Sequence, residues 1–249
     1  MNNIVLAAIT AVVLVHVFFA IRVLDSSPDV VLLSFDVEIV AADNKSMNEL
    51  LSILGERDIK ATFFVTGQYA EQNPDIVLNI DTQGHEIAGH SYSHPNFKRL
   101  NPGAQREEIR RCSEAIRKVT DVAPIGFRAP WRQLTPETYL ILKQEGFVYD
   151  ASHIDGYEWY FPLIQKSTIK EVYTSSFIFP ADDITMRYFL HVPSSVYFWM
   201  LLHTNSGTFS FHPGTVMKDK DRFERFLDKL KDNGAIFLTH GEEAELKAG

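Results

Sequence analysis

Short apolar runs alternate with amphipathic segments along the chain from residue 30 onward. The runs are rich in Val, Ile, Leu and Phe, as strands covered on both faces are. Repeated strand–helix alternation predicts a parallel sheet with right-handed crossovers, either open or closed into a barrel. Strands are expected at 30–35, 61–65, 85–88, 126–128, 147–149, 208–211 and 235–239, and helices at 46–56, 74–83, 102–119, 135–145 and 219–233. Ser46 or Asn44 is expected to cap the first helix.

An uncharged apolar segment precedes the predicted domain. Residues 4–21 contain no charged side chain, and in a helix they would span about 27 Å, close to the thickness of a bilayer core. No Lys or Arg precedes this segment and no clear small-x-small pair ends it, so an uncleaved anchor is favoured over a signal peptide or a buried helix. We expect residues 1–28 to be a single-pass membrane anchor with a linker. Residues 29–249 would then form one domain on the extracytoplasmic side.

The composition limits the partners and the redox chemistry. A chain of 249 residues suits one α/β domain of ordinary size. The net charge of −8 argues against a nucleic-acid partner, because such proteins bind phosphate with Lys and Arg. The single cysteine, Cys112, excludes an internal disulfide and a cysteine-only metal site, and its place in a predicted helix indicates a small buried residue.

Polar residues follow five of the predicted strands. In parallel α/β folds the carboxyl ends of the strands carry the chemistry, so these residues are predicted to converge on one rim as a single site. They are Asp36 and Glu38 after the first strand, His90 and His94 after the third, Arg128 and Trp131 after the fourth, Asp150 after the fifth, and His212 after the strand at 208–211.

His90 and His94 have the spacing of a pair of metal ligands. Four residues apart, they can place two imidazoles on one side of a turn. With an oxygen ligand from another strand they would form a two-histidine, one-carboxylate set with positions left open for water. On their own, two histidines at this spacing also occur on ordinary helices. The acidic residues after the first strand favour the metal site.

Several motifs resemble those of the polysaccharide deacetylase family (NodB homology, carbohydrate esterase family 4), whose members are metal-dependent amide hydrolases. The segment GHEIAGHSYSH at 84–94 resembles the His-Ser/Thr-x-x-His metal motif and its lead-in, and it is the most specific piece. SFDVE at 34–38, ATFFV at 61–65, RAPW at 128–131 and YDAS at 149–152 resemble further motifs. The resemblance covers about residues 30–243 and implies a deformed (β/α) barrel with fewer than eight strands.

The first motif departs from the common form of the family, which has two consecutive aspartates. Here Val37 separates Asp36 from Glu38, and alternation along a strand puts both carboxylates on one side. The form resembles a branch that includes intracellular deacetylases and allantoinase-like imide hydrolases. That resemblance implies Asp36 as the catalytic base and Glu38 as the metal ligand beside His90 and His94. The alternative is that Asp36 holds the metal, in which case the base is missing.

The resemblance also implies a general-acid histidine followed by one helix and a closing strand. Two histidines fit its Leu-x-His motif, and the predicted helix at 219–233 follows His212 but not His240, so His212 is favoured. A carboxylate beside His212 would raise its pKa, and Asp150 is preferred for this over Asp155. Arg128 beside Asp36 would lower the pKa of that carboxyl.

Aromatic residues are the candidates for contact with a substrate. Trp131 and Tyr92 are expected at the groove, although core packing is nearly as good an interpretation of Trp131. The segment 152–205 breaks the strand–helix alternation and is expected to form an insertion of loops, a hairpin and a short helix. Its residues Tyr157, Trp159 and Tyr160 can stack on a sugar face, but they fit the core of this insertion better.

The function implied by the resemblance is N-deacetylation of an acetylated amino sugar in a cell-envelope polysaccharide or peptidoglycan. The cofactor implied is a divalent metal ion, with zinc expected. Hydrolysis of a small cyclic amide and non-catalytic glycan binding remain alternatives. The expected anchor disfavours the first, and the full set of site residues disfavours the second.

Overall fold

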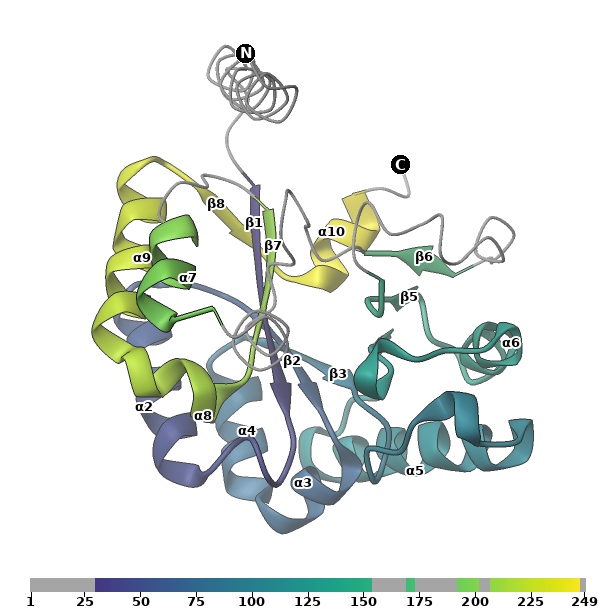
Figure 1. Ribbon diagram of the computed structural model, residues 1–249. Coiled ribbons are helices and arrows are strands. Elements are labelled where there is room, and N and C mark those ends of the chain that lie inside the picture. The colour runs from purple at the N-terminus through teal and green to yellow at the C-terminus, as the bar shows by residue number, and fades with distance from the viewer. Residues whose placement is uncertain (1–29, 154–168, 173–191, 202–206, 247–249) are drawn as a thin grey trace, which may run out of the picture.

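The computed structural model describes residues 30–153, 169–172, 192–201 and 207–246, which form a parallel sheet with helices packed around it (Figure 1). The expected anchor and most of the expected insertion lie outside the described residues, as do Asp155, Tyr157, Trp159 and Tyr160. Among the helices that are described, none has both the length and the apolar character needed to cross a bilayer.

The sheet is an incomplete barrel whose pairings are all parallel. Seven strands follow one another in the order β6-β5-β4-β3-β2-β1-β7, and β8 pairs separately with the start of β1. Within the described ranges no pairing joins β6 to β7, so the barrel is not closed there. The expected parallel sheet is confirmed. The strands are β1 (Val30–Val37), β2 (Thr62–Val65), β3 (Glu86–Gly89), β4 (Gly126–Phe127), β5 (Tyr149–Asp150), β6 (Lys170–Glu171), β7 (Gly207–Phe211) and β8 (Ile236–Leu238).

Helices connect the strands and cover the outside of the sheet. The longer helices are α2 (Asn44–Glu56), α4 (Pro74–Thr82), α5 (Pro102–Thr120), α6 (Pro136–Gln144) and α9 (Lys220–Asp232). The shorter helices are α3 (Gly67–Gln72), α7 (Ser194–Leu201), α8 (Pro213–Val216) and α10 (His240–Leu246). Helices α2, α8 and α9 lie on the side of β1 and β7, whereas α5 and α6 lie on the side of β3 and β5 (Figure 1).

The helix boundaries follow local capping chemistry. Asp43, not Ser46 or Asn44, caps α2, because its carboxylate accepts hydrogen bonds from the backbone nitrogen and the hydroxyl of Ser46 at 3.0 and 2.7 Å. The expected cap was therefore wrong: Ser46 is a donor in the first turn. Gly84 follows the end of α4 with φ of +77°, a conformation that glycine adopts without steric cost.

Strand β1 runs through the centre of the hydrophobic core. Seven of its eight residues are buried, and Phe35 stacks on Phe63 of β2 with ring centroids 5.1 Å apart. Burial of an aromatic side chain of this size contributes about 1.5–3 kcal/mol. Cys112 of α5 is buried as expected, donates to the carbonyl oxygen of Val65, and has its pKa raised by burial to about 12. Its thiol is therefore a packing group.

Candidate active site

The carboxyl ends of four strands bring the candidate residues to one rim of the sheet. Strand β1 carries Asp36 and is followed by Glu38, β3 is followed by the loop with His90 and His94, β4 is followed by Arg128, and β7 is followed by His212. The parallel pairing of β1 with β2 and β7 aligns these ends. The contacts below show which of the predicted residues meet.

Asp36 and Arg128 form a buried ion pair. An Oδ1–Nη1 distance of 2.6 Å joins them, Arg128 is fully buried and Asp36 is 6% exposed. Burial alone would raise the pKa of Asp36, but the positive charge of Arg128 outweighs it and holds that pKa well below its usual range. Asp36 is therefore an ionised carboxylate at neutral pH.

Further contacts fix the guanidinium of Arg128. Its Nη1 donates to Ser210 at 3.1 Å, its Nη2 donates to Ser34 at 3.0 Å, and its Nε donates to the carbonyl oxygen of Ala151 at 3.0 Å. Its Cζ lies 3.8 Å from the ring centroid of Phe64. A planar group held by several hydrogen bonds and an aromatic face has one orientation, so Arg128 aims its charge at Asp36.

One ring nitrogen of His90 forms a hydrogen bond with the backbone. Its Nδ1 lies 2.7 Å from the carbonyl oxygen of Arg128, and because that oxygen only accepts, Nδ1 carries the proton. Burial lowers the pKa of His90 to about 3, with the Asp36 carboxylate opposing the shift. The imidazole is therefore neutral, with Nε2 as its unprotonated nitrogen, and a backbone hydrogen bond of this kind is what orients histidines that bind metals.

His94 lies next to both His90 and Glu38. The ring centroids of the two histidines are 5.0 Å apart, and Nδ1 of His94 is 3.2 Å from Oε2 of Glu38. The two imidazoles thus lie side by side as expected, on a bent loop in which Ser91 and His94 have φ of +64° and +62°. Burial lowers the pKa of His94, so this imidazole is also biased toward the neutral state.

Glu38 and His94 are spaced as two ligands of one divalent cation would be, and His90 adds a neutral imidazole beside them. Two neutral imidazoles and a carboxylate are the ligand set of hydrolytic zinc sites. In a tetrahedral site with bonds of about 2.0–2.1 Å, neighbouring ligand atoms are about 3.3 Å apart. The distance of 3.2 Å between Glu38 Oε2 and His94 Nδ1 matches that spacing. One oxygen of Asp36 is held by Arg128, whereas Glu38 contacts His94.

Glu108 of α5 holds the loop between the two histidines. Its carboxylate accepts hydrogen bonds from the backbone nitrogens of Tyr92 and Ser93 at 3.0 and 2.8 Å, and from the hydroxyl of Ser93 at 2.8 Å. Sequence reasoning missed this residue. Its position on a helix with many charged neighbours gave no sign of a contact with the loop.

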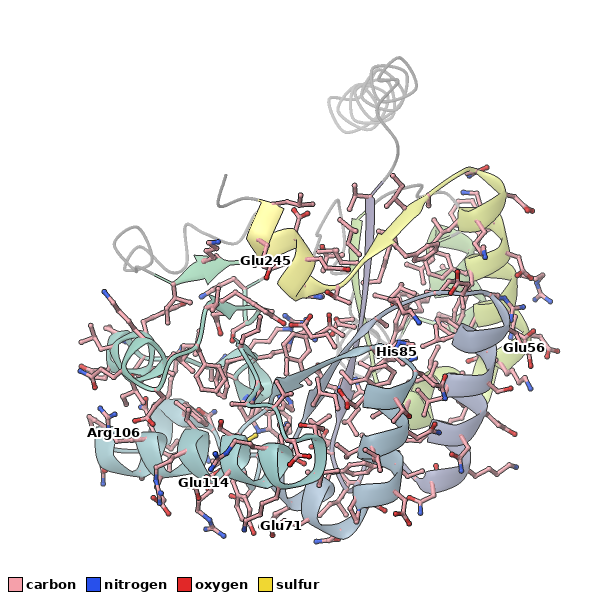
Figure 2. The ribbon with its side chains drawn as sticks, turned by 180° about the vertical axis from the view of Figure 1, so that it is seen from behind. Glu56, Glu71, His85, Arg106, Glu114 and Glu245 are labelled. Carbon is pink, nitrogen blue, oxygen red and sulfur yellow. The ribbon has the colours of Figure 1, made fainter. Side chains whose placement is uncertain are left out.

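Tyr92 contacts residues of α3 and α5. Its hydroxyl donates to Glu71 at 2.8 Å, and the Cζ of Arg111 lies 3.6 Å from its ring centroid. A Cβ at Gly67 would lie 2.5 Å from the Tyr92 ring, so a glycine is needed beneath it. Glu71 lies at the same outer edge of the molecule as α5 (Figure 2). These contacts hold Tyr92 against α3 and α5, and its role at the expected groove stays a prediction.

Trp131 lies on the rim beside His94. Its ring centroid is 5.4 Å from that of His94, yet 60% of the residue is exposed. Trp131 and Arg132 have φ of +56° and +53°, a left-handed conformation that costs about 1–2 kcal/mol for such residues. The position is therefore a wall of the site and not a part of the core.

His212 lies near Asp36 and His94, and Asp150 is held by Ser152. His212 is 8% exposed and is among the basic groups close enough to lower the pKa values of Asp36 and His94. The two oxygens of Asp150 accept hydrogen bonds from the hydroxyl and backbone nitrogen of Ser152 at 2.7 and 3.1 Å. The expected pairing of Asp150 with His212 stays a prediction.

Asp150 belongs to a second group of ionisable residues at the ends of β5 and β6. One ligand-type atom from each of Asp150, His153 and Glu171 lies within 4.8 Å of the others. Burial and the charge of Asp150 raise the pKa of Glu171, and neither of its oxygens has a well-aligned hydrogen bond, although the Tyr139 hydroxyl is close. Arg132 already places a positive charge near Asp150. Protonation of Glu171 is therefore favoured in this group.

Comparison with known protein families agrees with this geometry. A profile described as polysaccharide deacetylase matches residues 24–149, which span β1 to the start of β5 and include Asp36, Glu38, His90, His94 and Arg128. The chain belongs to the polysaccharide deacetylase family. His212 lies beyond the matched residues.

Individual relatives extend the likeness. The chain is 28% identical over 192 residues to the peptidoglycan-N-acetylglucosamine deacetylase of Bacillus cereus, covering 77% of this chain and 60% of that protein. A family 4 carbohydrate esterase from Streptomyces lividans, solved with acetate, matches with a TM-score of 0.63, 20% identity and coverage of 84% and 91% of the two chains. A family 4 pseudoenzyme from Bacillus anthracis matches with a TM-score of 0.66 and 19% identity, covering 88% of this chain and 66% of that chain. At such identities the structural matches show the fold alone.

Proposed function

We propose that this polysaccharide deacetylase family member is a metal-dependent hydrolase that removes the acetyl group from an N-acetylated amino sugar in a cell-envelope polysaccharide or peptidoglycan. One observation carries the proposal: Arg128 holds Asp36 as a buried carboxylate beside the His94–Glu38 pair. A base, a candidate metal set and a second basic group, His212, therefore share one rim. The name of the Bacillus cereus relative supports the class of substrate.

Glu38, His90 and His94 would hold the divalent cation, with zinc as the expected ion. Bound there, it would polarise the amide carbonyl and acidify a water molecule. The protein prepares this site by keeping both imidazoles neutral through burial. It also orients His90 by the hydrogen bond to the carbonyl oxygen of Arg128.

Asp36 would accept the proton of the attacking water. Its role depends on charge and position, because a carboxylate with a lowered pKa is ionised at every pH at which the enzyme would work. His212 would donate a proton to the departing amine, and the ionised Asp36 nearby favours the cationic form that this step requires. The exposed indole of Trp131 would pack against the sugar ring.

The test is the release of acetate from N-acetylglucosamine oligomers by the full chain, with and without a chelator. We expect release that the chelator stops and zinc restores. Asp36→Asn and His212→Ala should each lower it at least a hundredfold, whereas Asp232→Asn at an exposed position of α9 should not. Hydrolysis of allantoin or succinimide without acetate release would replace the proposal by the cyclic-amide alternative. Oligomer binding without hydrolysis would replace it by the non-catalytic one.

We also propose that residues 1–28 anchor the protein in a membrane with the catalytic domain on the extracytoplasmic side. The support is the uncharged apolar run at 4–21. Fractionation of cells that express the full chain should find it in the membrane at its full mass, and protease added to intact spheroplasts should digest residues 29–249. A shortened chain in the soluble fraction would indicate a cleaved signal peptide instead.

A further inference from the structure

His240 is a buried histidine for which the proposed chemistry has no use. It is the first residue of α10 and is fully buried. Its ring stacks on Tyr149 with centroids 6.2 Å apart and meets Phe64 edge-on at 5.3 Å. An imidazole enclosed in this way cannot reach a polysaccharide. Its sequence motif, FLTH, therefore does not mark a general acid.

The guanidinium of Arg128 connects His240 to the site. A guanidinium has five N–H donors. Four of them serve Asp36, Ser210, Ser34 and Ala151, as described above. The fifth, on Nη2, points to Nε2 of His240 at 3.4 Å. The imidazole thus completes the set of acceptors around the group that holds Asp36.

The direction of each hydrogen bond follows from this contact. Arg128 can only donate, so Nε2 of His240 is the acceptor and the ring proton is on Nδ1. Nδ1 lies 3.2 Å from Oγ1 of Thr62, which also accepts from the backbone nitrogen of His240 at 2.8 Å. The Thr62 hydroxyl then donates to Oε2 of Glu86 at 2.8 Å. Every group in this series of hydrogen bonds, from Glu86 through Thr62 and His240 to Arg128, is thereby assigned as a donor or an acceptor.

The far end of this chain is itself held in place. Glu86 also accepts hydrogen bonds from the hydroxyl of Tyr149 at 2.8 Å and from the backbone nitrogen of Gly241 at 2.9 Å. Glu86 and Thr62 come from adjacent strands and are direct partners in the parallel pairing of β2 with β3. The Thr62 hydroxyl is therefore fixed by the sheet, and through it the rotation of the His240 ring.

We propose that His240 is a positioning residue for the catalytic base: its Nε2 accepts the fifth hydrogen bond of Arg128 and so fixes the plane in which the guanidinium meets Asp36. The effect of His240 on catalysis rests on the proposed function, whereas the hydrogen bond itself rests on the contacts alone. His240 acts through Arg128 and touches neither substrate nor metal.

The arrangement can be tested without activity by NMR of the imidazole nitrogens in the ¹⁵N-labelled full chain. His240 should show an unprotonated Nε2 and a protonated Nδ1. Arg128→Met, which removes the donor, should shift the Nε2 signal, whereas Arg106→Met on α5 should leave it unchanged. A protonated Nε2 in the wild-type protein would overturn the proposal. This measurement on the wild type does not depend on whether any variant folds.

The effect on catalysis is tested with His240→Leu and His240→Gln. Leucine cannot accept a hydrogen bond, whereas glutamine offers a side-chain oxygen in its place. His240→Leu should lower kcat for acetate release about tenfold, the change expected for one lost positioning contact, with KM and zinc affinity within about twofold of wild type. His240→Gln should recover most of that loss. Equal losses of kcat in both variants would overturn the positioning role.

A failure of this inference can be told apart from a failure of the proposed function. If no glycan releases acetate, the proposed function fails, while the NMR result still decides whether His240 accepts from Arg128. If acetate is released and His240→Leu has the wild-type kcat, the proposed function stands and the positioning role is overturned.

Discussion

The carbonyl oxygen of Arg128 lies 2.7 Å from Nδ1 of His90, while the guanidinium of the same residue lies 2.6 Å from Asp36. Arg128 thus orients the candidate metal ligand His90 through its backbone and the candidate base Asp36 through its side chain. The positions of these two groups are therefore coupled, and a change at Arg128 is expected to affect both.

Arg128→Met tests the electrostatic part of this coupling. Burial would raise the pKa of Asp36 once the cation is gone, so the acid limb of the pH profile of kcat/KM should move to higher pH by one unit or more. Breaking a buried pair on one side should also lower the free energy of unfolding by about 3–5 kcal/mol. An acid limb that stays in place in a folded variant would contradict the assignment of Asp36.

The same ion pair makes a prediction for the wild-type protein. The folded-state pKa of Asp36 is below its unfolded value, so its contribution to stability is present above the unfolded pKa of about 4. That contribution should be lost as the pH falls below 4. Chemical unfolding at pH 3 and 6 should show a smaller pH dependence for Asp36→Asn than for the wild type.

Glu108→Ala should loosen the loop that carries His94. The substitution removes three hydrogen bonds, which the backbone nitrogens of Tyr92 and Ser93 and the hydroxyl of Ser93 donate to Glu108, and zinc affinity should fall about tenfold. The matched control is Glu107→Ala on the same helix, because Glu107 is exposed and forms an ion pair with Arg110 of that helix. Equal zinc affinities for the two variants, measured by calorimetry, would argue against a role for Glu108.

Trp131→Ala should weaken binding of oligomers more than turnover. The indole is exposed beside His94, so its loss should raise KM for N-acetylglucosamine oligomers several-fold with little change in kcat. Trp199→Ala is the control, because that indole on α7 is also 60% exposed. A fall in kcat at constant KM would instead indicate that Trp131 positions His94.

Glu171→Gln should stabilise the protein at alkaline pH. The folded-state pKa of Glu171 is raised by burial and by Asp150, so its protonated form is favoured and stability is lost as the pH rises above the unfolded value of 4.5. Glutamine cannot ionise and avoids that loss. The Tm of the variant should exceed that of wild type at pH 8 and approach it at pH 4.5. Glu245→Gln, an exposed change on α10, should have no such pH dependence (Figure 2).

The periodic part of the fold could be predicted from the sequence. Helices α5 and α9 have long amphipathic patterns, and β1 is a continuous apolar run, so their places were expected within two residues. The helices α3, α8 and α10 were missed because four to seven residues are too few to show a period. β6 has two residues and depends on pairing with β5, which a local pattern does not reveal.

The part of the site that follows from strand topology could be predicted from the sequence. Residues after parallel strands meet at a common rim, and this rule brings Asp36, His90 and Arg128 together. It does not say which neighbours on that rim touch, so the pairing of Asp150 with Ser152 was missed. Serines inside strands carry no chemical signal in the sequence, and Ser34 and Ser210 become recognisable only from their bonds to Arg128.

The most direct test of the account separates the base from the metal ligand by measuring zinc content and acetate release together in Asp36→Asn and Glu38→Gln. Asp36→Asn should retain one bound zinc and lose acetate release at least a hundredfold. Glu38→Gln should lose both, because Glu38 lies against His94 whereas Asp36 is held by Arg128. Loss of zinc from Asp36→Asn with zinc retained in Glu38→Gln would contradict the assignment and leave the site without its base.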